Sequence, residues 1–129
     1  MKKLLIVDDS QDLLEAMKYF LEKKNYLVEA ISNHKEIFKA VAEFQPDLVM
    51  LDIFLSGADG RDVCKKLREN YETKYLCIMM FSASPEALHQ HIEYGADGCI
   101  EKPFDLQNIL ETIETVMESC KDNVYKKSA

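Results

Sequence analysis

The sequence predicts an α/β domain in which a single parallel β-sheet is covered by helices on both faces. Short apolar runs alternate with amphipathic stretches along the chain, so that a strand–helix unit is repeated five times. The third run, Asp47 to Asp52, has an uninterrupted apolar centre, which is typical of a strand buried on both faces of a parallel sheet. Units of this kind connect through right-handed crossovers.

Five runs rich in apolar or β-branched residues predict the strands. They cover residues 4–7, 26–31, 47–52, 76–81 and 98–100. Pro46 directly precedes the third run and is expected to end the helix before it, because proline disfavours helical backbone in the residue that it follows. Residues 56–60, Ser-Gly-Ala-Asp-Gly, predict a loop after the third strand.

Each predicted strand is followed by apolar residues at helical spacing. Several of these stretches begin with residues that cap helices, namely Ser10, Asn33 with Glu36 three residues later, Ser84 before Pro85, and Asp105. The apolar positions of the five predicted helices are Leu13, Leu14, Met17, Phe20 and Leu21; Ile37, Val41 and Phe44; Val63 and Leu67; Leu88 and Ile92; and Leu106, Ile109, Leu110, Ile113, Val116, Met117 and Cys120. Gly95 is expected to close the fourth helix.

Length and charge limit the classes of protein to which the chain can belong. A length of 129 residues fits one domain, and we expect residues 1–121 to form it and residues 122–129 to form a polar C-terminal tail. The formal net charge of −7 argues against direct binding of nucleic acid. No apolar run approaches the roughly 20 residues that cross a bilayer, and the first run stops too early for a signal peptide. The sequence therefore predicts a cytoplasmic protein without a membrane span.

The cysteines and histidines show no spacing typical of a metal site. Cys64, Cys77, Cys99 and Cys120 form no CxxC pair, so zinc ligation is not expected. We expect reduced thiols that are mostly packed in the interior. The three histidines are expected to be surface or partly buried residues.

Chemically active side chains follow four of the predicted strands. Asp8 and Asp9 follow the first strand, Asp52 ends the third, Ser82 follows the fourth and Lys102 follows the fifth. Ligands of open α/β sheets bind outside the carboxyl ends of the strands, so we expect these side chains to meet there. Three carboxylates at one edge repel one another, and Mg²⁺ would turn that repulsion into a binding site. Beside such an ion, a carboxylate can attack phosphorus while an ammonium and a hydroxyl pair with phosphoryl oxygens.

Each of these residues also has an ordinary explanation when it is considered alone. Asp8 and Asp9 could simply favour a helix start, and Asp52 could be a turn residue. Ser82 alone carries little information, and Lys102 could be a solvated loop charge. The occurrence of all five at one sheet edge, in this order, favours a functional site.

Taken in order, these motifs resemble those of response-regulator receiver domains over roughly residues 3–120. The matching segments are Asp8-Asp9, Leu-Asp-Ile-Phe-Leu at 51–55, Phe-Ser-Ala at 81–83, and residues 95–104, which lead to Lys102-Pro103. The resemblance implies a flavodoxin-like three-layer sandwich of five βα units with strand order 2-1-3-4-5.

The resemblance also implies a role for each matching residue. Asp52 would be the phosphoacceptor, with Lys102 and Ser82 as the catalytic side chains beside it. Mg²⁺ would be the cofactor. Its ligands would be Asp9 directly, Asp8 mainly through water, Asp52, and the backbone carbonyl of Phe54.

The implied partners are a phosphoryl donor and a downstream target. The donor would be a phosphohistidine on a sensor histidine kinase or a histidine phosphotransfer protein. Ser82 would then move toward the phosphoryl group, and the face made by the fourth helix, fifth strand and fifth helix would change shape to control a downstream protein or effector domain. The same face could support a homodimer. Such a domain is a signalling switch and not an enzyme, and it needs neither nucleic acid nor membrane as a direct partner.

Two positions depart from the pattern of this family. Ser56 stands where the family usually has proline, which favours a more mobile loop. Cys99 stands where the family usually has tyrosine or phenylalanine as a rotating switch on the fifth strand. Because a small thiol cannot swing as a ring does, phosphorylation could be intact while its coupling to output is altered.

Three alternatives compete with a phosphorylated receiver. An aspartate-nucleophile phosphatase of the haloacid-dehalogenase kind would need an acid two residues after its nucleophile, where Phe54 stands. A flavodoxin would need a hydroxyl- and glycine-rich phosphate loop, whereas residues 8–12 are acidic. A degenerate receiver acting only as a docking module stays open because of Cys99. The sequence names neither the kinase nor the target.

Overall fold

The computed structural model describes residues 1–122, and most of the predicted tail, residues 123–129, lies outside the described residues. Five strands form one parallel sheet in the order β2-β1-β3-β6-β7. The elements of the sheet and its connections are β1 (Lys3–Val7), α1 (Gln11–Lys23), β2 (Leu27–Ile31), a 3₁₀ turn (His34–Glu36), α2 (Ile37–Phe44), β3 (Leu48–Asp52), β4 (Phe54–Leu55), β5 (Ala58–Asp59), α3 (Gly60–Glu69), β6 (Ile78–Ser82), α4 (Pro85–Leu88), β7 (Gly98–Glu101) and α5 (Leu106–Ser119). The predicted fold class and strand order are confirmed.

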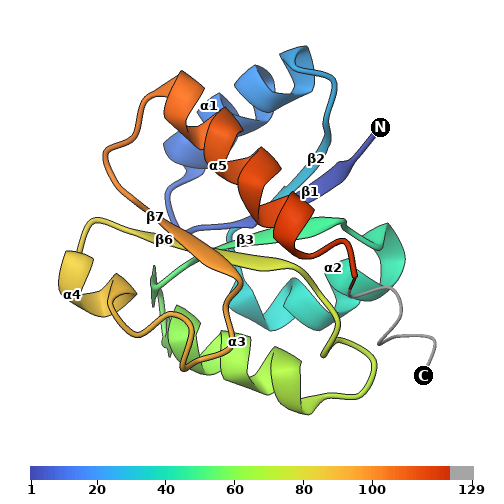
Figure 1. Cartoon of the computed structure of the whole chain (residues 1–129), viewed down its shortest axis with the longest axis vertical. Coiled ribbons are helices and arrows are strands. Elements are labelled where there is room, and N and C mark those ends of the chain that lie inside the picture. The colour runs from blue at the N-terminus through green and yellow to red at the C-terminus, as the bar shows by residue number, and fades with distance from the viewer. Residues whose placement is uncertain (123–129) are drawn as a thin grey trace.

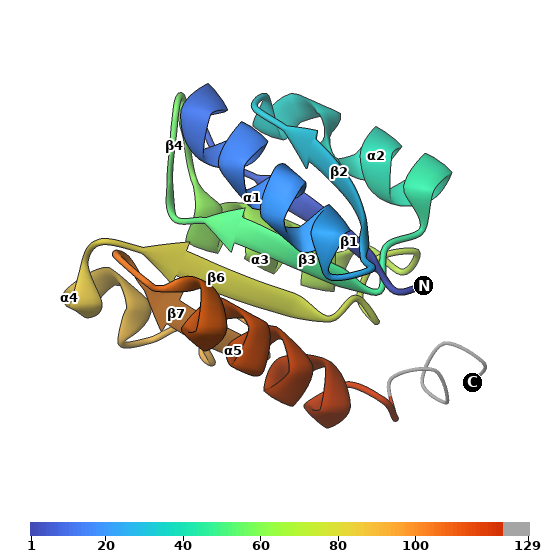
Figure 2. The same ribbon diagram turned by 90° about the horizontal axis from the view of Figure 1, so that it is seen from above.

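The helices form two layers, one on each face of the sheet. Helices α1 and α5 cover one face and α2, α3 and α4 cover the other (Figures 1 and 2). Because side chains alternate along a strand, Leu4 and Ile6 of β1 point into the first layer and Leu5 and Val7 into the second. All four are fully buried, so the sheet has a continuous apolar core on both faces.

The predicted caps form where the sequence placed them. The side chains of Ser10, Ser84 and Asp105 accept hydrogen bonds from the backbone N–H groups three residues later. Asn33 instead accepts from Lys35, and the segment begins as a 3₁₀ turn rather than with a reciprocal capping box.

Two local expectations were wrong. Only residues 56 and 57 of the predicted loop 56–60 form a turn: they connect β4 to β5 in a short antiparallel hairpin, and Gly60 already begins α3. The fourth helix is a single turn that stops at Leu88 instead of running to Gly95. Ile92 has helical spacing from Leu88 but is 73% exposed, so no packing stabilises a second turn.

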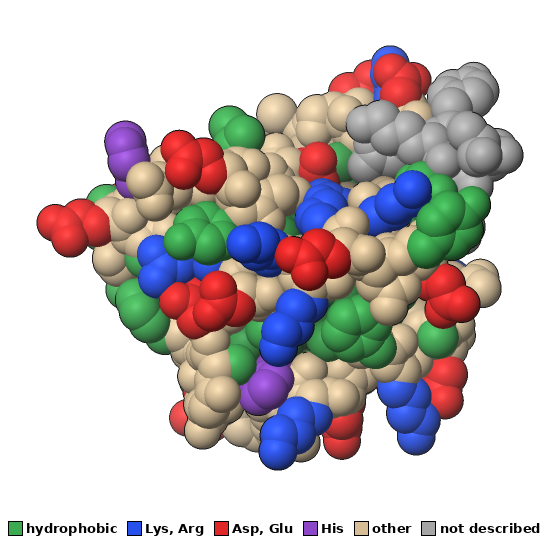
Figure 3. Space-filling model, turned by 90° about the horizontal axis from the view of Figure 1, so that it is seen from below, with side chains coloured by type: hydrophobic (Ala, Val, Ile, Leu, Met, Phe, Trp, Pro, Cys, Tyr) green, Lys and Arg blue, Asp and Glu red, His purple; other side chains and the backbone are tan. Residues whose placement is uncertain are grey.

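The surface agrees with the charge balance of the sequence. Acidic and basic side chains are interspersed on the face of the molecule seen from below, without a continuous basic stripe (Figure 3). No helix within residues 1–122 is long and apolar enough to cross a membrane.

Candidate functional site

Four neighbouring strands carry the candidate residues to the carboxyl edge of the sheet. Asp8 directly follows β1, Asp52 ends β3, Ser82 ends β6 and Lys102 directly follows β7. In the register of β3 and β6, Asp52 pairs with Phe81, so Ser82 lies one residue beyond it. The backbone N–H of Lys102 donates to the carbonyl of Ser82 at 2.8 Å, which ties the ends of β6 and β7 together.

Lys102 joins the first and third strands through its ammonium group. Its Nζ lies 2.9 Å from Oδ2 of Asp8 and 3.7 Å from Oδ1 of Asp52. The same Nζ lies 4.8 Å from the centroid of the Phe81 ring, which adds a cation–π contact. The other oxygen of Asp8 accepts a hydrogen bond of 2.7 Å from the backbone N–H of Ser10. The buried Asp8 carboxylate is therefore fixed from two sides.

The Asp52 carboxyl occupies an environment that disfavours its charge. Burial, followed by the negative charge of Asp8, raises the pKa of Asp52 from 3.8 to about 6. The Lys102 ammonium and a backbone hydrogen bond from Phe54 oppose that rise in pKa, and Asp9 adds a smaller repulsion. At neutral pH this side chain is an anion that burial and its acidic neighbour destabilise.

The three acidic residues do not contribute equally. Asp8 and Asp52 are buried, whereas Asp9 is exposed. Within residues 1–122, the only group of three His, Cys, Asp or Glu ligand atoms within 4.8 Å of one another is Cys77, Asp97 and Cys120. The structure thus brings Asp8, Asp52 and Lys102 together. The carboxylate oxygens of Asp8, Asp9 and Asp52 do not all lie within 4.8 Å of one another.

Ser82 is buried and its hydroxyl is oriented by the chain that follows it. Its Oγ accepts a hydrogen bond of 3.1 Å from the backbone N–H of Ser84. Phe54, two residues after Asp52, is by contrast 58% exposed. The ring therefore stands at the rim of the site and not in the core.

Gly60 supports the backbone beneath the site, a role that the sequence did not suggest. Its N–H donates to the carbonyl of Ile53 at 2.6 Å. A Cβ at this position would collide with the backbone of Asp52 and Ile53, so only glycine permits this approach. This contact is between residues that are seven positions apart, and no periodicity of the sequence predicts it.

Cys99 lies on β7 and is partly buried, packed against the interior on the α2–α4 side. Burial raises the pKa of its thiol, so it is a neutral side chain at ordinary pH. Cys64 is fully buried, and burial raises its thiol pKa to about 11. Both residues fit the expectation of reduced, packed thiols.

The same expectation was wrong for the other two cysteines. Cys77 and Cys120, which are 43 positions apart in sequence, form a disulfide in which the Cα atoms are 5.7 Å apart. The end of α5 packs over the start of β6, and that packing brings the two residues together. Sequence spacing alone could not show this proximity.

Comparison with known proteins identifies the family. The model of the response regulator receiver domain matches residues 4–114. The alkaline phosphatase synthesis transcriptional regulatory protein PhoP of Bacillus subtilis is 32% identical over 118 residues, which span 90% of this chain and 48% of PhoP. The chain thus spans about half the length of that relative.

Solved structures give the same answer. CheY4 of Vibrio cholerae superposes with a TM-score of 0.82 at 27% identity, covering 90% of this chain and 98% of its own. A CheY-like response regulator receiver domain protein of Methanospirillum hungatei gives a TM-score of 0.84 at 26% identity, covering 95% and 98% respectively. With the matching family model, these similarities show that the chain belongs to the response regulator receiver domains of two-component signal transduction.

Proposed function

We propose that Asp52 accepts a phosphoryl group from a phosphohistidine on a sensor histidine kinase or a histidine phosphotransfer protein. An oxygen of the Asp52 carboxylate attacks phosphorus, the P–N bond breaks, and its electron pair stays on the imidazole nitrogen of the donor. The observation that carries this proposal is the buried Asp52 carboxylate, destabilised as an anion, with an ammonium 3.7 Å away. The receiver domain would comprise residues 1–121.

The acidic residues also suit a hard divalent cation. Asp52 is a buried carboxylate that Asp8 and Asp9 repel, and Mg²⁺ prefers oxygen ligands of this kind together with water. Asp9 would bind the ion directly, Asp8 mainly through water, and Asp52 and the backbone carbonyl of Phe54 would complete the set. Bound there, the ion supplies positive charge that screens the incoming phosphoryl group.

Lys102 and Ser82 would stabilise the product. The Lys102 ammonium can pair with a phosphoryl oxygen, and the Ser82 hydroxyl, which accepts a hydrogen bond from the Ser84 N–H, can donate its own proton to another. Because the backbone N–H of Lys102 donates a hydrogen bond to the carbonyl of Ser82, movement of Ser82 would also displace the end of β7. The face of α4, β7 and α5 would then change to control a downstream partner or effector domain, or a homodimer.

A docking module that works without phosphorylation is the second candidate. Cys99 favours it, because the small, partly buried thiol on β7 has no ring to move between two positions. The two functions differ in whether binding to a target depends on phosphorylation.

The proposal is tested by incubating the protein with acetyl phosphate and Mg²⁺ and measuring its intact mass. We expect one phosphoryl group per chain, in an adduct that is stable in acid, labile in base and absent with EDTA. Asp52→Asn should abolish it, and Asp12→Asn, a change of an exposed acid in the first turn of α1, should not. An unchanged adduct in Asp52→Asn would refute the proposal, and continuous release of phosphate from phosphate esters would favour a phosphatase.

The exposed ring of Phe54 is expected to prolong the life of the acyl phosphate. It stands two residues after Asp52 at the rim of the site, where it can hinder the approach of water. Phe54→Asn should therefore speed hydrolysis of phospho-Asp52 by roughly ten-fold, equivalent to about 1.4 kcal/mol of barrier. The decay of adduct after removal of acetyl phosphate measures this, with Phe38→Asn, another partly exposed phenylalanine, as control. An unchanged lifetime would rule out shielding by Phe54.

A further inference from the structure

Cys77 and Cys120 lie at the end of the sheet opposite Asp52. Cys77 directly precedes β6, and Cys120 is the C-terminal cap of α5. Their Cα atoms are 5.7 Å apart, within the usual separation of bonded cysteines. The fold therefore holds the two sulfur atoms within bonding reach, and the bond joins the last turn of α5 to the central sheet.

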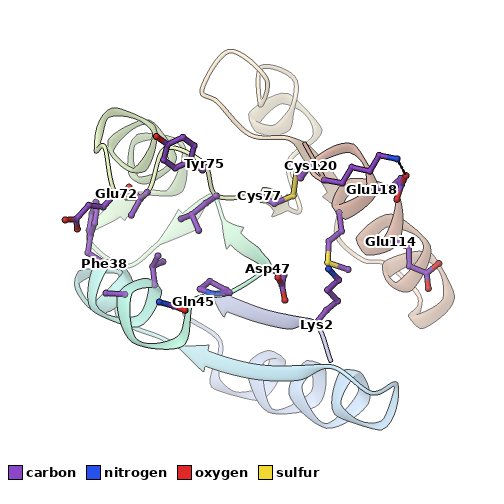
Figure 4. A pocket seen from close by; sticks show the side chains of 17 residues that line it. Lys2, Phe38, Gln45, Asp47, Glu72, Tyr75, Cys77, Glu114, Glu118 and Cys120 are labelled. Carbon is purple, nitrogen blue, oxygen red and sulfur yellow. Dashed lines mark hydrogen bonds and ion pairs between the residues drawn. A yellow bond between two sulfur atoms is a disulfide. The ribbon is translucent and has the colours of Figure 1, made fainter. Parts of the chain in front are cut away.

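Cys77 and Cys120 are only 5% and 7% exposed, and the route by which a small molecule could reach their bond is a cavity that both residues line. It has a volume of about 730 Å³ and is lined by both cysteines (Figure 4). Its charged lining residues are Lys2, Asp47, Glu72, Glu114, Glu118 and Lys121. Four acids against two lysines make the cavity less accessible to a reagent as the negative charge of the reagent increases.

The carboxylate nearest to the two sulfur atoms is already engaged. Asp97 accepts hydrogen bonds at Oδ2 from Arg68, at 2.7 Å, and from the backbone N–H of Ile78, at 2.9 Å. These contacts hold the loop before β7, and the Arg68 cation would repel a metal ion. The chemistry that remains for Cys77 and Cys120 is thiol–disulfide exchange and not metal binding.

We propose that Cys77 and Cys120 form a site of reversible thiol–disulfide exchange, oxidised by small-molecule disulfides and reduced by small-molecule thiols. This inference is independent of the phosphoryl chemistry proposed for Asp52. The two other cysteines cannot replace either member of the pair, because Cys64 and Cys99 pack on the α2–α4 side of the sheet whereas Cys77 and Cys120 pack on the α1–α5 side.

The exchange proceeds through a mixed disulfide. The thiolate of the reductant attacks one sulfur, a new S–S bond forms, and the Cys77–Cys120 bond breaks with its electron pair on the departing cysteine, which takes a proton. A second thiol of the reductant then attacks the mixed disulfide, which frees the other cysteine and leaves the reductant as a disulfide. Oxidation by a small-molecule disulfide runs through the same steps in reverse.

Reduction would release the end of α5 without disrupting the core. The carbonyl of Val116 lies 3.6 Å from Sγ of Cys77, so the thiol formed there has an acceptor. Ile109 and Ile113 still pack against the sheet. Loss of a link that closes a loop of this length should lower the melting temperature by roughly 10 °C.

The experiment equilibrates the full chain with glutathione disulfide or with dithiothreitol, then alkylates the denatured protein and measures its mass. We expect two alkylated cysteines after oxidation and four after reduction. The reduced protein should melt at a lower temperature than the oxidised protein. The oxidised Cys77→Ala and Cys120→Ala variants should melt like the reduced wild type, and Cys99→Ser should keep the full redox shift. Four free thiols after oxidation, or a melting temperature indifferent to redox state, would overturn the proposal.

Two further readouts separate this site from the rest of the molecule. At equal thiolate concentration, reduction by 2-mercaptoethanol, whose thiolate carries one negative charge, should be faster than reduction by 2-mercaptoethanesulfonate, whose thiolate carries two. The difference should shrink at high salt, and equal rates would overturn the cavity as the route. The Cys77→Ala variant should still be phosphorylated by acetyl phosphate if Asp52 accepts phosphate at all. Failure of the wild type to take phosphate would count against the proposed function alone.

Discussion

Asp52→Asn is expected to raise the free energy of unfolding of the metal-free protein by about 2 kcal/mol near neutral pH, although it removes the proposed phosphoacceptor. The pKa of Asp52 is raised from 3.8 to about 6, chiefly by burial and then by Asp8. Near neutral pH the carboxyl is ionised in both states, but ionising it in the folded protein costs more free energy than ionising it in the unfolded chain. Asparagine keeps the shape of the side chain without the charge.

The pH dependence follows from the same shift in pKa. Between about pH 4 and pH 6 the folded wild type binds more protons than the unfolded chain, so its stability falls as the pH rises. Above pH 6 Asp52 is ionised in both the folded and the unfolded state, so the full loss of stability caused by its buried charge remains. The advantage of Asp52→Asn should thus grow from about pH 4 to pH 6 and then level off.

Urea unfolding in EDTA at a series of pH values measures this effect. Asp12→Asn, which changes an exposed acid, should match the wild type throughout. Mg²⁺ should stabilise the wild type more than Asp52→Asn, because the ion binds only the folded state and loses one carboxylate ligand in the variant. A variant less stable than the wild type above pH 6 would show that Lys102 more than compensates for the burial of Asp52.

Lys102→Met, unlike Asp52→Asn, is expected to lower the free energy of unfolding, by about 3 kcal/mol near neutral pH. The ammonium lies 2.9 Å from Asp8 and 3.7 Å from Asp52, and methionine removes its charge while keeping much of the chain length. Two buried acidic side chains are then left without their cation. The loss should shrink as the pH falls through about 6, because protonation of Asp52 removes one of the two charges.

A double-mutant cycle isolates this interaction. In the Asp52→Asn background, Lys102→Met should cost clearly less, because only the Asp8 partner remains. Lys65→Met, a change of an exposed lysine on α3, is the control. Phosphorylation of Lys102→Met by acetyl phosphate should also slow by at least roughly ten-fold. Equal costs in both backgrounds would mean that Lys102 does not interact with Asp52.

The alternation of apolar runs and helical stretches was sufficient to predict the fold. Runs such as 47–52 are apolar because both faces of the strand are buried, and local caps such as Ser10 form within a few residues. The extent of α4 could not be predicted in this way. Ile92 continues the helical spacing of Leu88, but whether it reaches the sheet depends on tertiary packing, and it remains exposed.

The location of the candidate site was predictable for a topological reason. Parallel strands deliver their last residues to one edge, so Asp8, Asp52 and Lys102 had to lie near one another once the strand order was known. The detailed pairing was not predictable, because a lysine side chain can reach either acid and the structure places it closer to Asp8. The Cys77–Cys120 bond likewise depends on how α5 packs over β6, which no local pattern encodes.

The most direct test of the account is to locate the phosphoryl group after reaction with acetyl phosphate and Mg²⁺. Borohydride converts an acyl phosphate into a stable alcohol, and tandem mass spectrometry then identifies the modified residue. The tryptic fragment 40–61 contains Asp47, Asp52 and Asp59, so fragmentation must distinguish them. We expect the modification at Asp52, dependent on Mg²⁺; modification at another residue, or none in the Mg²⁺-loaded protein, would contradict the account.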